Sequence, residues 1–175
     1  MTETPIKKRF ILPPRIDKRT VGLLLYLTTA FVGMLVVFGV HIAPDSNMLV
    51  NSSLNCGAGY CLFLDITERI GGAHYLWITA LIQCVLQAYT IFSLIEYVVR
   101  TSKLHALYGY VLATGFVLLY LLQTVVTTQG RIPSNAILSE GIAFPLYYMM
   151  FKYAYAAIRE DYARYLLSAA MLSFF

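Results

Sequence analysis

Two ionisable side chains lie inside long apolar stretches of this sequence and are the first candidates for chemistry. Glu96 lies one helical turn before the end of one stretch, and Lys152 lies near the end of another. Charges in an apolar surrounding are costly, so they usually pair or reach toward water along their stems. At helical rise their depths differ by about 3 Å. The sequence leaves two possibilities open: a Glu96–Lys152 ion pair between helices, or separate contacts with interfacial water.

Three glutamine side chains also fall within apolar stretches. Gln83 and Gln87 share one helical face, and Gln123 lies in the next stretch. Buried amides usually form hydrogen bonds between helices. In a second interpretation, a solute path is lined by Gln83, Gln87, Tyr148 and Lys152. Pro145 lies in the same stretch as Lys152 and would favour such a path, because proline bends a helix. Small residues at Gly109 and Ala113 predict close approach by another helix.

Two histidines could ligate haem. His41 closes the first apolar stretch and His74 opens the second, so a membrane would place both imidazoles at the same boundary. Matched depth is what a bis-histidine b-type cytochrome needs. The residues next to both histidines are polar, so the two histidines are equally well interpreted as ordinary residues of the membrane interface. The sequence therefore predicts no resident cofactor.

The segment between these histidines carries Cys56 and Cys61, with two intervening glycines that ease a tight turn. We expect a disulfide loop there on an oxidising side of the membrane. Free thiols and a metal site are the alternatives, and a metal site lacks the four ligands that structural zinc needs. Asn51 begins a possible N-glycosylation triplet.

The sequence predicts neither an enzyme nor a metal protein. It contains no Ser-His-Asp set, paired catalytic carboxylates, phosphate-binding loop or zinc signature. The basic N-terminus, taken alone, would suggest nucleic acid. Because a long apolar stretch begins at Val21, a basic flank beside a membrane is the better interpretation, and no nucleic acid partner is expected.

The elements that position these residues are expected to be four transmembrane helices. Of the 175 residues, 59% are hydrophobic and 13% are charged, about half the charge of a soluble domain. A bilayer core needs about 20 apolar residues in a helix. The apolar stretches predict an all-α domain over residues 21–158, with spans at about 21–43, 74–99, 104–128 and 136–158. The remaining parts are a basic, Pro-containing strap at 1–20, an outer loop at 44–73 and an amphipathic tail at 159–175. We expect the tail to form a short helix in the inner interface or to continue the fourth helix.

Lysine and arginine predict the orientation. Ten lie on the side that contains both termini, Arg69 and Arg131 lie on the other side, and Lys152 lies within the fourth span. Basic residues accumulate on the inner side of membranes, so both ends are expected to be inside. The pattern suits a mitochondrial inner membrane as well as the endomembrane system or plasma membrane. The short segment 100–103 predicts an antiparallel hairpin of the second and third spans.

Three short motifs in the C-terminal half resemble the four-span haem transporters of the haem-responsive-gene family. They are Thr127–Gly130, Lys152–Tyr153 and Tyr162–Tyr165. The family's outer-loop histidine would fall near Thr128, and its span-two histidine has no counterpart here. The resemblance implies a small solute transporter with haem as a candidate solute.

The leading prediction is a different one. The basic strap, the small residues and amides of the spans, and the apolar second half of the outer loop favour a non-catalytic accessory or scaffolding subunit. Its expected partners are the lipid bilayer and other membrane protein subunits. The transporter and the b-type cytochrome are the alternatives.

Overall fold

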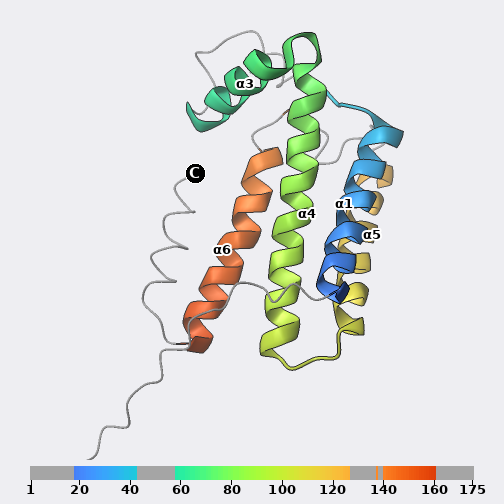
Figure 1. Cartoon of the computed structure of the whole chain (residues 1–175), viewed down its shortest axis with the longest axis vertical. Coiled ribbons are helices and arrows are strands. Elements are labelled where there is room, and N and C mark those ends of the chain that lie inside the picture. The colour runs from blue at the N-terminus through green and yellow to red at the C-terminus, as the bar shows by residue number, and fades with distance from the viewer. Residues whose placement is uncertain (1–17, 43–57, 127–136, 138–139, 161–175) are drawn as a thin grey trace, which may run out of the picture.

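All the secondary-structure elements of the described part of the chain are helices. The structure is a computed structural model that describes residues 18–42, 58–126, 137 and 140–160. In chain order, its helices are α1 (Lys18–Phe38), α3 (Ala58–Gly71), the short 3₁₀ helix η1 (Gly72–His74), α4 (Tyr75–Thr101), α5 (Leu107–Val126) and α6 (Glu140–Glu160). The long helices α1, α4, α5 and α6 lie side by side, and α3 lies across one end of this bundle (Figure 1).

Three helical stretches are long and apolar enough to cross a membrane: Lys18–Phe38, Gly59–Thr101 and Leu107–Thr124. They confirm the prediction of an all-α protein with membrane-spanning helices. Helix α6 has 21 residues but is less apolar and does not belong to this group. A fourth crossing by α6 therefore stays a prediction.

The apolar core lies where α1 and α5 pack against α4. Leu27, Phe31 and Leu35 repeat every four residues along α1 and are almost completely buried. They meet a stripe of small residues on α4, which consists of Ala80, Cys84 and Ala88, all fully buried. Small side chains let helices approach closely, so van der Waals contact over the whole length holds this pair together. Gly109 and Ala113 of α5 are also buried, as predicted.

Helix α1 differs from its predicted boundaries at both ends. It begins at Lys18, inside the predicted strap, and it ends at Phe38, earlier than the predicted residue 43. The early end has a local cause. Gly39 adopts a left-handed φ of 70°, and its N–H donates to the Leu35 carbonyl at 2.8 Å. A glycine in this conformation just past the last turn ends a helix.

The connection from α4 to α5 forms the predicted antiparallel hairpin (Figure 1). After α4, the Leu104 N–H donates to the Val99 carbonyl at 3.0 Å, and the Lys103 N–H donates to the Arg100 carbonyl at 3.3 Å. This is a Schellman ending. Its left-handed position is occupied by Lys103, with φ of 53°, where glycine would be usual.

Helix α3 lies within the segment 44–73 that was predicted as an outer loop, so residues 58–71 of this segment are helical. Its buried residues Tyr60, Leu64 and Thr67 follow a helical spacing on one face, and that face packs on α4. Gly72, at φ of 50°, allows the chain to turn from α3 into α4. Gly71 leaves room for Ile78, because a Cβ there would lie 2.6 Å from its Cδ1.

Candidate functional site

A row of polar side chains runs along the buried side of α4. It consists of Thr79, Gln83, Gln87, Thr90 and Ser93, each at most 8% exposed, and we call it the α4 polar stripe. The residues recur at intervals of three and four, so they lie on one helical face. From first to last the stripe covers about 21 Å at helical rise, most of a bilayer core. Polar atoms at this depth need partners from other helices.

The first half of the stripe along the chain contacts α3. The Thr79 hydroxyl donates to the Thr67 hydroxyl at 2.8 Å, and the Thr67 hydroxyl donates to the Leu64 carbonyl at 2.9 Å. Next along α4, the Gln83 amide donates to the Tyr60 hydroxyl at 3.2 Å. These bonds fix α3 across the end of the bundle.

The middle of the stripe joins three helices. The Gln87 amide donates to the Tyr120 hydroxyl of α5 at 2.6 Å, and that hydroxyl lies 3.1 Å from the Tyr148 hydroxyl of α6. The edge of the Phe31 ring packs against Tyr120 with centroids 5.1 Å apart. The predicted roles of Gln83 and Gln87 in joining helices are thus visible. The side-chain oxygens of both amides lack a hydrogen-bond partner in the structure.

The two ionisable residues lie near the end of the stripe that is farther from α3, but they do not pair with each other. The Lys152 ammonium of α6 donates to the Ser93 hydroxyl at 2.6 Å. Glu96 accepts from Arg100, one turn further along α4, also at 2.6 Å. A direct Glu96–Lys152 ion pair, one of the two possibilities that the sequence left open, is therefore not what the structure shows. For Glu96, Arg100 is already in position four residues further along the same helix. Lys152 bonds instead to Ser93.

Removing the partner of Lys152 should cost more than removing Lys152 itself. Ser93→Ala leaves a partly buried ammonium without its hydrogen bond, and we expect the free energy of unfolding to fall by about 1–3 kcal/mol. Lys152→Met keeps the length of the side chain and removes the charge, so it should lie within about 1 kcal/mol of the parent or above it. Denaturant unfolding in detergent micelles, followed by circular dichroism, measures both. A larger loss for Lys152→Met than for Ser93→Ala would contradict this account.

The other sequence candidates lie outside the stripe. Gln123 is exposed on α5, unlike Gln83 and Gln87. His74 is exposed on η1, and His41 is half-buried after α1, where its carbonyl accepts a hydrogen bond from the Ile137 N–H at 3.1 Å. Haem ligation by these histidines stays a prediction. Cys61 lies on α3, while Cys56 and Asn51 lie outside the described residues, as do the motifs 127–130 and 162–165.

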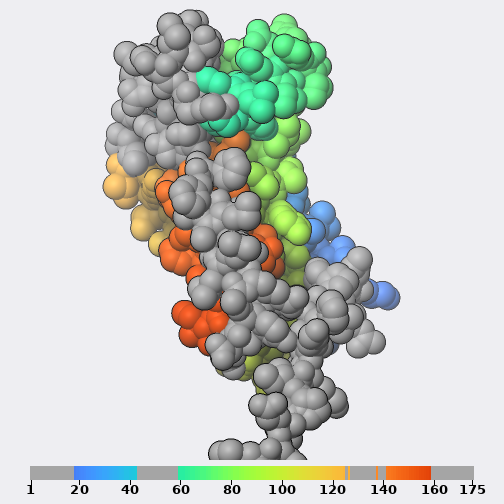
Figure 2. Space-filling view, turned by 90° about the vertical axis from the view of Figure 1, so that its left-hand side faces the viewer, coloured from blue at the N-terminus to red at the C-terminus, as the bar shows by residue number. Residues whose placement is uncertain are grey.

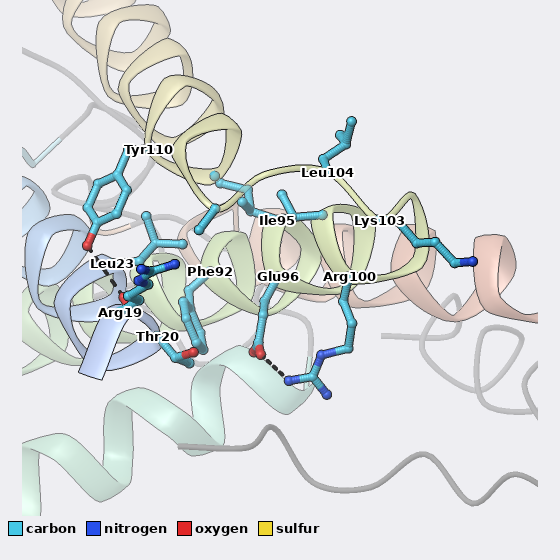
Figure 3. A pocket seen from close by; sticks show the side chains of 13 residues that line it. Arg19, Thr20, Leu23, Phe92, Ile95, Glu96, Arg100, Lys103, Leu104 and Tyr110 are labelled. Carbon is cyan, nitrogen blue, oxygen red and sulfur yellow. Dashed lines mark hydrogen bonds and ion pairs between the residues drawn. The ribbon is translucent and has the colours of Figure 1, made fainter. Parts of the chain in front are cut away.

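A second candidate site is a cavity of about 410 Å³ at the opposite end of the bundle from α3. It lies between the start of α1, the end of α4 and the start of α5 (Figure 3). Its polar lining comes from Arg19 and Thr20 of α1, Glu96 and Arg100 of α4, Lys103 just after α4, and Tyr110 of α5. The solute path that the sequence suggested involves Tyr148, Lys152, Gln83 and Gln87. None of these residues lines this cavity.

Sequence reasoning missed this cavity and several partners of the stripe. The Glu96–Arg100 pair could have been found from its spacing of four residues, which places the two side chains on adjacent turns of one helix. The bonds of the stripe to Tyr60 and Tyr120, and the bond of Lys152 to Ser93, join different helices, so they depend on how those helices are rotated. Comparison of the chain with known protein families, with curated proteins and with solved structures found no match.

Proposed function

We propose that this chain is a non-catalytic, four-span membrane protein that serves as an accessory or scaffolding subunit of a larger membrane complex. The observation that carries the proposal is the use of the buried polar groups. Gln87 bonds to Tyr120, the Tyr120 hydroxyl in turn bonds to the Tyr148 hydroxyl, and Lys152 bonds to Ser93. Such groups join helices within membranes. Their engagement in holding α4, α5 and α6 together favours a structural role.

Two observations support a fourth crossing by α6 and termini on the same side. Helix α6 lies beside α4 for much of its length (Figure 1) and, at about 1.5 Å per residue, is long enough to cross a bilayer core. Its polar members Tyr148 and Lys152 face partners on α5 and α4. The ten-to-two distribution of lysine and arginine gives the orientation, with α3 outside.

The outer side is also where a disulfide would persist. We include in the proposal a Cys56–Cys61 disulfide at the start of α3, and the disulfide-bonded state of Cys61 supports it. Such a link closes a short loop and would restrain the entry of the chain into α3.

The bundle presents extensive apolar surface that lipid or protein must cover. On α1, Val36 and Val37 are more than 70% exposed, and α5 exposes Leu119 and Leu122. The outward side of α6 reaches the surface in Figure 2, and Phe151 and Ile158 are exposed on this helix. Exposure of this extent in a small protein fits contact with both acyl chains and neighbouring subunits.

The test is site-specific photo-crosslinking in native membranes. A photoreactive side chain is placed on α1 at Val37, on α5 at Leu119 or on α6 at Phe151, and the buried Ala88 of α4 is the matched control. We expect at least one exposed position to give a protein adduct of discrete mass, and the control to give none. The same partner should remain with the chain on a native gel after extraction in mild detergent.

Two results would overturn the subunit proposal. Adducts with lipid alone at all three exposed positions, together with a native band that contains only this chain, would show a protein without partners. A specific adduct at Ala88 would show that the helices separate in the membrane.

A solute transporter is the second candidate, because two buried amide oxygens are left without partners. The Oε1 atoms of Gln83 and Gln87 lie on the same face of α4 and could bind a polar solute. Pro145 of α6 lies within the helix that faces them. A partner-free homo-oligomer in the native gel would favour this candidate, and a Soret absorption band in that oligomer would favour the two haem hypotheses, the haem transporter and the b-type cytochrome.

A further inference from the structure

The cavity at the inner end of the bundle has a polar end and an apolar end. On α1, Arg19 and Thr20 precede Leu23, and on α4 the apolar residues Phe92 and Ile95 precede Arg100. Because α1 starts and α4 ends at this side, both helices change from polar to apolar in the same direction, toward the middle of the bundle. A ligand that fills the cavity therefore meets charge at one end and hydrocarbon at the other.

The polar end favours an anion. Three basic residues, Arg19, Arg100 and Lys103, line the cavity together with the single carboxylate of Glu96. Lys103 extends away from the others in Figure 3, so the two arginines carry the argument. Arg100 uses one guanidinium nitrogen for Glu96, and its side chain is 48% exposed. A guanidinium has five N–H donors, so Arg100 keeps donors for a second anion, and phosphate geometry suits them.

The walls of the cavity depend on glycine at two positions. A Cβ on Gly22 would lie 2.8 Å from the Tyr110 hydroxyl, so this glycine allows Tyr110 to reach the start of α1, where it donates to the Arg19 carbonyl at 3.4 Å. On α5, Gly109 keeps its side of the cavity free of a side chain, facing Leu23 and Ile95. The cavity is therefore framed by fixed contacts between α1 and α5.

We propose that this cavity binds the headgroup of an anionic phospholipid from the inner leaflet. The phosphate would contact Arg19 and Arg100, and an acyl chain would lie along Leu23, Phe92 and Ile95. Basic pockets between helices on the inner side of a membrane are suited to such headgroups. A free phosphate compound would leave the apolar end unused. The inference rests on the proposed orientation but not on the presence of a partner subunit.

The experiment is native mass spectrometry of the full chain, released from detergent with equal amounts of phosphatidylglycerol and phosphatidylcholine. We expect the protein to retain one phosphatidylglycerol in preference to phosphatidylcholine. Arg19→Gln and Arg100→Gln should each reduce that preference about fivefold. Arg69→Gln, on the exposed side of α3 at the opposite end, is the matched control and should leave it unchanged.

Glu96→Gln separates charge recognition from a general effect on the fold. Removing the carboxylate takes away repulsion and releases Arg100, so this variant should raise the preference for phosphatidylglycerol. Equal retention of both lipids, an equal loss in Arg69→Gln, or a loss in Glu96→Gln would overturn the proposal. Release of the bound lipid by millimolar glycerol phosphate would identify a site for soluble phosphate compounds and would also overturn it. Crosslinking to a partner is scored separately, so either proposal can fail alone.

Discussion

Replacing Gly141 with leucine should lower the free energy of unfolding by about 3 kcal/mol, the upper end of the usual cost of overpacking. Gly141 lies in the first turn of α6 and packs directly on α4. A Cβ at this position would overlap the Gln83 side chain, with Nε2 at 2.3 Å and Cδ at 2.5 Å. Gln83 cannot simply move aside, because it is fully buried and its amide is bonded to Tyr60. Unfolding in detergent micelles, followed by circular dichroism, measures the loss.

Gly33→Leu is the matched control for this substitution. Gly33 also lies within a helix, and no atom comes within 4 Å of a Cβ built there. Leucine has a higher helix propensity than glycine, so this variant should be as stable as the parent or more stable by up to about 1 kcal/mol. Gln83→Ala should make room and restore part of the stability of Gly141→Leu. If the double variant loses the sum of both single effects, the steric explanation is wrong.

Phe31→Ala should destabilise the protein by about 3–5 kcal/mol, the range for removing a large side chain from a close-packed core. Phe31 is completely buried between α1 and α4, and its ring meets the Tyr120 ring at 83°. The substitution therefore removes packing and also one wall of the pocket around Tyr120, which accepts the Gln87 hydrogen bond. The measurement is unfolding by denaturant in micelles at constant detergent concentration.

The same substitution at Phe151 provides the comparison. Phe151 lies on α6 and is 58% exposed. Its ring lies outside the core both when the helices are packed together and when they are separated. Phe151→Ala should therefore change the free energy of unfolding by less than about 1 kcal/mol. Similar losses at the two positions would mean that Phe31 does not lie in the core.

Long apolar stretches were enough to predict most helices of the bundle. The charge-free stretch that starts at Val21 and the stretch between His74 and Arg100 correspond to α1 and α4, because length and apolarity are local properties of a sequence. Their ends were less predictable. Phe38 ends α1 because Gly39 takes a left-handed conformation, and an apolar sequence continues beyond it without any sign of the change.

The candidate sites were predictable only in part. Gln83 and Gln87 were recognised because amides in apolar stretches need partners, yet nothing in their own helix says that Tyr60 and Tyr120 provide them. Depth alone left a Glu96–Lys152 pair open as one of two possibilities for Lys152. Depth does not determine the rotation of a helix, and rotation brings Lys152 to Ser93. The cavity at the end of the bundle opposite α3 is formed by three helices, so its juxtaposition of Arg19 and Arg100 has no counterpart along the chain.

The α4 polar stripe also bears on how this chain is made. Helix α6 is less apolar than α1, α4 and α5. It emerges from the ribosome after α4 and α5. Under the proposed topology, its lysine and tyrosines would enter lipid at a cost if they entered alone. Ser93 and Tyr120 offer hydrogen-bond partners that are already in the membrane by then. We therefore expect membrane integration to follow chain order, with the earlier helices acting as the template on which α6 is inserted.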